Sequence, residues 1–72
     1  MEFTVVLRGY DREQVDTALD QIKHRTLSAA AASRIEFAVA WRGYDREQVQ
    51  HHLGRLVAEE RQEELRRQEG AA

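Results

Sequence analysis

The stretch RGYDREQV, Arg8–Val15, occurs a second time without a change as Arg42–Val49. The match extends outward on both sides, because residues 2–22 and 36–56 align without a gap and share 12 of 21 positions. The repeat predicts one small domain, residues 1–72, made of two units at 2–33 and 36–69.

Each unit opens with a segment typical of a β-strand. Phe3, Val5 and Leu7 alternate with other side chains, and β-branched residues are frequent. We expect strands over about 2–8 and 35–42. A glycine follows each strand and permits a sharp turn. In the second strand, the same alternation places Trp41 on the core face with Phe37 and Val39.

Each RGYD turn leads into a helix. The carboxylate of Asp11 can accept hydrogen bonds from the first turn, and Gln14, three residues later, can reach back to complete a capping box. Asp45 and Gln48 repeat this pair. Apolar residues at spacings of three and four predict amphipathic helices over about 11–32 and 45–69. Beyond Val57 the second helix is almost entirely charged or polar, which is typical of a solvated or partner-contacting helix.

The order β-α-β-α predicts an α+β fold with parallel strands, and a right-handed crossover if the strands pair. Both turns then emerge at one end of the molecule. A two-stranded sheet is marginal alone, so we expect a homodimer with a continuous four-stranded sheet. The alternative is a mainly α coiled-coil dimer.

Composition excludes several classes of protein. The net charge of −2 is unlike the basic field of a nucleic-acid-binding domain. The chain has no cysteine, so neither disulfides nor thiolate chemistry are available. No apolar run approaches the roughly 20 residues needed to cross a bilayer. We expect a cytoplasmic protein, with peripheral contact at the inner face of the cell membrane as the alternative.

Most of RGYDREQV has a structural explanation as strand end, turn and helix cap. The residues with that role are Gly9, Tyr10, Asp11, Gln14, Gly43, Tyr44, Asp45 and Gln48. The arginine that opens each copy can pair locally with an acidic residue or contact an anion such as a lipid phosphate. Together with the apolar residue before it, this arginine defines the candidate contact residues: Leu7, Arg8, Trp41 and Arg42.

The sequence holds no convincing catalytic or metal site. The three histidines, at 24, 51 and 52, lack the spacing of a ligand set, because adjacent residues on a helix point in different directions. No Ser/His/Asp grouping stands in a motif. We expect neither an enzyme nor a bound metal or cofactor.

Both copies of the pattern F-x-V-x-[LW]-R-G-Y-D-R-E-Q-V-x-x-x-L resemble the DivIVA domain signature. The first unit matches with Arg8–Asp11, Gln14–Asp16 and Leu19, and the second with Arg42–Asp45, Gln48–Val49 and Leu53. The second unit has Gln50 where the family prefers Asp or Asn. In place of the family's aromatic residue before the leucine stand Ala18 and His52. The resemblance covers about 42 of the 72 residues.

The resemblance implies a bacterial protein of cell division or polar growth. Members of the family are parallel coiled-coil dimers that bind membrane through the apolar residue and arginine before Gly-Tyr, which are Leu7, Arg8, Trp41 and Arg42 here. They carry a long coiled coil after the domain, whereas this chain has only a short helix. The first hypothesis is a scaffold or targeting module that contacts anionic lipids and other division proteins. The alternative is a protein-binding or oligomerisation adaptor without membrane binding.

Overall fold

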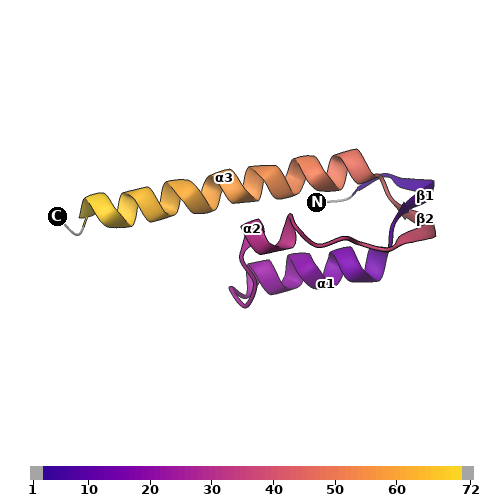
Figure 1. Cartoon of the computed structure of the whole chain (residues 1–72), viewed down its shortest axis with the longest axis horizontal. Coiled ribbons are helices and arrows are strands. Elements are labelled where there is room, and N and C mark those ends of the chain that lie inside the picture. Colours follow the sequence, from indigo (N-terminus) through magenta and orange to yellow (C-terminus); the bar gives the residue numbers. More distant parts are fainter. Residues whose placement is uncertain (1–2, 71–72) are drawn as a thin grey trace.

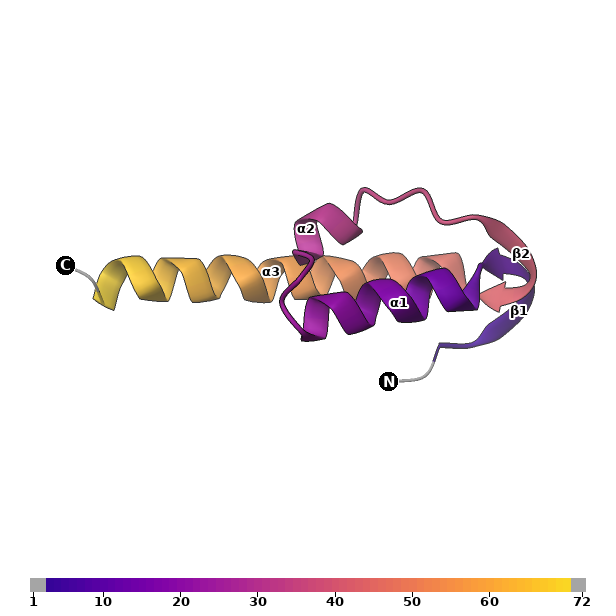
Figure 2. The same ribbon diagram turned by 90° about the horizontal axis from the view of Figure 1, so that it is seen from below.

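The computed structural model describes residues 3–70 as a small α+β fold of two strands and three helices. The elements are, in order, β1 (Val5–Tyr10), α1 (Arg12–Lys23), α2 (Ala29–Ala32), β2 (Val39–Tyr44) and α3 (Arg46–Gly70). The molecule is elongated, about 50 × 19 × 19 Å. Both strands lie at one end, and α1 and α3 run side by side away from them (Figure 1, Figure 2).

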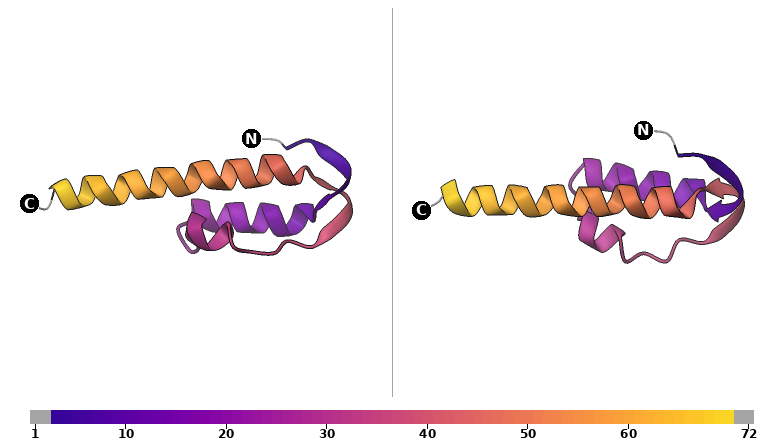
Figure 3. Two further views of the ribbon diagram at one scale, coloured as in Figure 1. Left: turned by 45° about the horizontal axis from the view of Figure 1, so that its top comes forward. Right: turned by 90° about the horizontal axis from the view of Figure 1, so that it is seen from above.

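The strands pair antiparallel, so the expectation of parallel strands is wrong. Val5 lies opposite Tyr44 and Tyr10 opposite Val39, so residue numbers fall along β2 as they rise along β1. The reason is where the strands lie. They do not run along the helices, as in a βαβ unit, but curve across the end of the helix pair and cross each other there (Figure 2, Figure 3). The single chain shows a sheet of two strands, β1 and β2.

Each strand continues through its glycine instead of ending before it. Gly9 and Gly43 are buried where the strands cross, and neither has a positive φ. A Cβ atom on Gly9 would overlap the carbonyl oxygen of Tyr44, and one on Gly43 would overlap the backbone of Gly9. Glycine is therefore needed for close approach of two backbones, not for a turn. The strands also begin later than predicted, at Val5 and Val39, and residue 2 of the first prediction lies outside the described residues.

The first predicted helix, 11–32, is two helices. α1 ends at Lys23, and Arg25 adopts a left-handed φ of 61° in the turn that follows. Ser28 then starts α2, because its Oγ accepts a hydrogen bond from the backbone N–H of Ala31 at 3.1 Å. Serine is a preferred N-cap residue, and here that preference interrupts an alanine-rich helix. The second helix agrees with its predicted bounds to within one residue at each end.

The core lies between α1 and α3 and is closed by α2 and the segment before β2. Its buried side chains come from all these segments: Val15, Ala18, Ala32, Phe37, Val49 and Leu53. Burying a side chain of valine or leucine size contributes roughly 1.5–3 kcal/mol, so this is a thin core.

Contacts between the two halves of the chain occur in pairs related by the 34-residue offset. The backbone N–H of Asp11 donates to the carbonyl of Ala38 at 2.8 Å, and that of Asp45 donates to the carbonyl of Thr4 at 2.9 Å. Aromatic contacts follow the same rule: Tyr10 packs on Phe37 at a centroid separation of 5.2 Å, and Phe3 packs on Tyr44 at 5.3 Å. Each half thus contacts the other through equivalent residues.

Candidate functional site

Leu7 and Trp41 protrude from the strand end of the molecule. Their side chains are 69% and 70% exposed, and the neighbouring Val5 and Val39 are also exposed. The expectation that Trp41 and Val39 share the core face with Phe37 is therefore wrong for both, although Phe37 is buried. The alternation does not extend back to Phe37, because β2 begins only at Val39. Val6 and Ala40 are half-buried, as are Tyr10 and Tyr44 at the ends of the two strands.

Arg8 and Arg42 stand next to these apolar side chains and are exposed. Among residues 3–67, whose side chains the structure describes, the ion pair is that of His24 with Asp20, so neither guanidinium is neutralised. The local pairing with an acidic residue considered from the sequence is not formed. Arg42 also has a φ of 59°, a left-handed conformation that costs a non-glycine residue roughly 1–2 kcal/mol. The two turns therefore differ in backbone conformation.

The four exposed apolar residues and two arginines lie on the two strands at one end of the molecule, and we call this set the tip: Val5, Leu7, Arg8, Val39, Trp41 and Arg42. Arg8 of β1 lies opposite Trp41 of β2 in the sheet, so the tip residues of the two strands are neighbours. Apolar side chains beside unpaired cations can contact a surface that offers both hydrocarbon and anions.

The residues after the arginines hold the tip in place. Asp11 Oδ1 accepts from the backbone N–H of Gln14 at 3.1 Å, and Asp45 Oδ1 accepts from that of Gln48 at 3.2 Å. Both carboxylates thus cap a helix and fix the direction in which the chain leaves the sheet.

The two glutamines do not close capping boxes, which corrects the expectation. Gln14 Oε1 accepts from the backbone N–H of Ala38 at 2.8 Å, and Gln48 Oε1 accepts from that of Thr4 at 2.7 Å. Each amide therefore binds the segment leading into the other unit's strand. The sequence carries no signal for this role, because the partner lies far along the chain.

The tyrosines also connect the two units. Tyr44 donates from its hydroxyl to Asp16 Oδ1 at 2.9 Å, and Tyr10 accepts from the amide of Gln50 at 3.1 Å. Both rings are half-buried. Asp16 and Gln50 occupy equivalent places in the two units, so the glutamine of the second unit keeps the bond to the tyrosine and reverses its donor.

His52 is half-buried, which the sequence did not reveal. Its ring meets Phe3 edge-on at a centroid separation of 5.6 Å, and its Nδ1 is buried without a hydrogen-bond partner. Burial, and after it the charge of Arg55, lowers the pKa of His52. The described residues bring together no group of three His, Cys, Asp or Glu that could hold a metal ion.

Shallow hollows lie on the described part of the surface. One lies beside Trp41 and Arg42 and is bordered by Asp16 and Thr17 of α1. The other lies where α3 outruns α1 and is rich in glutamates. In the part of the chain that the structure describes, no helix is long and apolar enough to traverse a bilayer.

Comparisons with models of protein families, with curated proteins and with solved structures each found no match for this chain.

Proposed function

We propose that the chain is a non-catalytic, DivIVA-like module that targets or scaffolds proteins of bacterial cell division or polar growth by contacting anionic membrane with its tip. The observation that carries this proposal is the exposure of Leu7 and Trp41 beside the unpaired Arg8 and Arg42. The two apolar side chains enter the interfacial region of the bilayer while the guanidinium groups meet lipid phosphates. The protein acts from the cytoplasmic side, at the inner face of the membrane.

The two units act together in this proposal. Reciprocal hydrogen bonds and ring contacts support an approximate twofold relation between the units, which carries both strand turns to one end. A single basic residue near an anionic surface contributes about 1 kcal/mol to binding. Burying one exposed apolar side chain adds only a few kcal/mol more. Two turns that engage at once add these contributions within one molecule.

The acidic character of the rest of the chain favours contact by the tip alone. Apart from Arg8 and Arg42, the chain carries 13 acidic residues against 9 lysines and arginines, so the rest of it repels an anionic surface. Charges farther than about 8–10 Å from the surface are screened at physiological salt. We therefore expect an end-on orientation, with the helices pointing away from the membrane.

Co-sedimentation with vesicles of defined composition tests the proposal. The parent chain is expected to bind vesicles that contain anionic lipid and to bind zwitterionic vesicles much less. The variant with Trp41→Ala and Arg42→Glu is expected to lose roughly tenfold or more in affinity, because it loses apolar burial and gains repulsion.

A matched control is Arg34→Glu with Ile35→Ala. This pair is also an exposed arginine beside a partly exposed apolar residue, but it follows α2, away from the tip. It should leave vesicle binding unchanged. Equal binding by the tip variant and the parent would refute insertion of the tip.

The second candidate is a protein-binding or oligomerisation adaptor that does not contact membrane. It is favoured by the part of α3 beyond Glu60, which is exposed at residues 61–67 and is free to meet another protein. Under this alternative the parent chain remains in the supernatant with every vesicle composition, and the tip contacts a protein partner.

A further inference from the structure

The residues that lead into the two strands are packed differently in the two units. Phe37, before β2, is buried at 6% exposure and belongs to the core cluster that includes Ala18. Phe3, at the equivalent position before β1, is only half-buried and packs edge-on against the ring of His52. His52 in turn is equivalent to Ala18, since the two positions differ by the 34-residue offset. One unit therefore has a titratable ring where the other has a methyl group.

The buried side of the His52 ring is suited only to its neutral form. Its Nδ1 atom is buried and has no hydrogen-bond partner among the described residues. A neutral imidazole can carry its proton on Nε2 and leave Nδ1 bare, whereas a protonated imidazole has a donor at both nitrogens. Burying a donor without an acceptor costs free energy, and burying a charge without a partner costs more. Protonation therefore disfavours the position that the ring occupies against Phe3.

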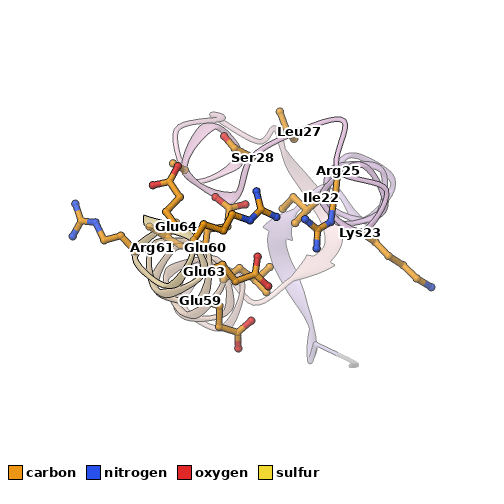
Figure 4. Close-up of a pocket in the computed structure, with 14 residues that line it drawn as sticks. Ile22, Lys23, Arg25, Leu27, Ser28, Glu59, Glu60, Arg61, Glu63 and Glu64 are labelled. Carbon is orange, nitrogen blue, oxygen red and sulfur yellow. The ribbon is translucent and has the colours of Figure 1, made fainter. Parts of the chain in front are cut away.

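The charges near His52 do not compensate for this cost. Burial is the largest influence that lowers the pKa of His52, and the positive charges of Arg55, the amino terminus and His51 lower it further. Glu59, farther along the same helix, raises the pKa, but by less than burial or Arg55 lowers it. The side chain of Glu64 points to the opposite side of α3 from that of Glu59 (Figure 4). The acidic groups of this helix therefore do not act on His52 together.

The described residues before β1, Phe3 and Thr4, carry no charge and are attached to the start of α3 by hydrogen bonds. The carbonyl of Thr4 accepts from the backbone N–H of Asp45 at 2.9 Å, and its N–H donates to Gln48 Oε1 at 2.7 Å. The amide of Gln48 also donates to Thr4 Oγ1 at 3.1 Å. Because all three bonds depend on where Thr4 lies, displacing the adjacent Phe3 ring from His52 weakens them together.

The other unit makes the equivalent hydrogen bonds without a histidine. The backbone N–H of Asp11 donates to the carbonyl of Ala38 at 2.8 Å, and the N–H of Ala38 donates to Gln14 Oε1 at 2.8 Å. Phe37, the residue before Ala38, packs on Tyr10 and within the core cluster. The two sets of bonds provide a comparison within one molecule.

We propose that His52 is a pH-sensitive switch: protonation of its ring displaces Phe3 and detaches the segment before β1 from α3, while the segment before β2 keeps its contacts. The switch acts on one unit because the equivalent residue, Ala18, does not titrate. Since the detached segment leads into the strand that carries Leu7 and Arg8, opening loosens this half of the tip. The inference goes beyond the proposed function and does not rest on it.

The switch opens as the pH falls. In the attached state the pKa of His52 lies below the ordinary value of 6.5, whereas in the detached state the ring is free of Phe3 and regains that value. The detached state therefore binds more protons below pH 6.5, and its population rises relative to the attached state by up to about tenfold for each pH unit. Above pH 6.5 both states hold the neutral ring, and the segment stays attached.

Amide hydrogen exchange measured by NMR tests the switch, with rates expressed as protection factors so that the intrinsic effect of pH is removed. As the pH is lowered through 6.5, the amides of Thr4 and Asp45 should lose protection, by up to about tenfold for each pH unit. The amides of Ala38 and Asp11 should keep their protection over the same range. Equal losses at both sets would indicate unfolding of the whole chain, and constant protection at both sets would show that no segment detaches. Either result overturns the proposal.

Variants at position 52 assign the effect to the histidine. His52→Ala copies position 18, and His52→Gln retains a polar side chain that does not titrate, so both should remove the pH dependence at Thr4 and Asp45. His51→Ala is the matched control and should retain the dependence, because His51 is exposed on the same helix. Circular dichroism shows whether each variant keeps the helix content of the parent chain. A dependence that persists in both His52 variants contradicts the proposal.

Discussion

At the scale of single residues, Gly9 and Gly43 allow the close strand crossing that fixes the tip. They lie where β1 and β2 cross, and each meets backbone atoms of the other strand. Backbone cannot move aside as a flexible side chain can, so no residue with a Cβ fits without separating the strands. Separation would also pull Tyr10 and Tyr44 away from the other unit.

Replacing Gly9 by alanine is expected to lower the free energy of unfolding by about 3 kcal/mol or more, because the added methyl group overlaps the Tyr44 carbonyl. Urea denaturation followed by circular dichroism measures this change. Gly54→Ala is the control: nothing lies within 4 Å of its Cβ position, and alanine should stabilise the interior of α3 by about 0.5–1 kcal/mol. Equal stability of the Gly9 variant and the parent would contradict the observed strand crossing.

His52 makes stability depend on pH in a defined direction. Burial against Phe3 lowers its pKa in the folded chain from the ordinary value of 6.5. The unfolded chain therefore binds more protons than the folded chain just below pH 6.5, and the free energy of unfolding falls as pH falls through this range. His52→Ala, which copies the alanine of the equivalent position 18, should flatten that part of the profile.

Thermal unfolding at a series of pH values measures the effect of His52. His51→Ala is the control, because the side chain of His51 is exposed on the same helix. If the profile keeps its slope just below pH 6.5 after His52 is removed, the pH dependence belongs to another group.

At the scale of elements, the three helices differ in how far along the sequence the residues that stabilise their N-termini lie. The first turns of α1 and α3 are capped by Asp11 and Asp45, each just before its own helix. α2 is too short to be stable alone, and its N-terminus also receives Glu60 from α3. A carboxylate at that end accepts a hydrogen bond from a free N–H group and interacts favourably with the positive end of the helix dipole.

Glu60→Ala is expected to destabilise α2 locally by about 1–2 kcal/mol, because the N–H of Ala29 loses its acceptor. Hydrogen exchange of the amides from 29 to 32 should accelerate, while the amides of β1 and β2 keep their rates. Glu59→Ala is the neighbouring control, since its side chain is exposed. Unchanged exchange in α2 would show that Glu60 does not hold it.

The elements that the sequence predicted well are those set by nearby residues. The α+β class, the order of strand and helix in each unit and the bounds of α3 follow from alternation, helical spacing and the residues that precede each helix. The sequence does not predict the turn before Ser28, because the high helix propensity of the following alanines favours one continuous helix over a new start at the serine cap. The antiparallel pairing, the strand crossing and the roles of Gln14 and Gln48 depend on contacts across about 34 residues, which local pattern does not encode.

At the scale of the whole molecule, the described chain is an elongated α+β fold whose two strands cross at one end (Figure 2). Each unit supplies part of the other's hydrogen bonding, so the core and the tip form together. The candidate contact residues were predicted as a set, but the exposure of Trp41 was not, because it depends on how the strands curve across the helix ends. The central proposal is that this exposed end meets an anionic membrane.

Trp41 is the only tryptophan in the chain, and its fluorescence reports on the tip directly. Titration with vesicles containing anionic lipid is expected to shift its emission to the blue, and lipids brominated in the upper acyl chain should quench it, because the indole leaves water for the interface. Zwitterionic vesicles should produce little change. An emission spectrum that stays that of an exposed indole at saturating anionic lipid, with no quenching, would contradict the proposal that the tip enters the membrane.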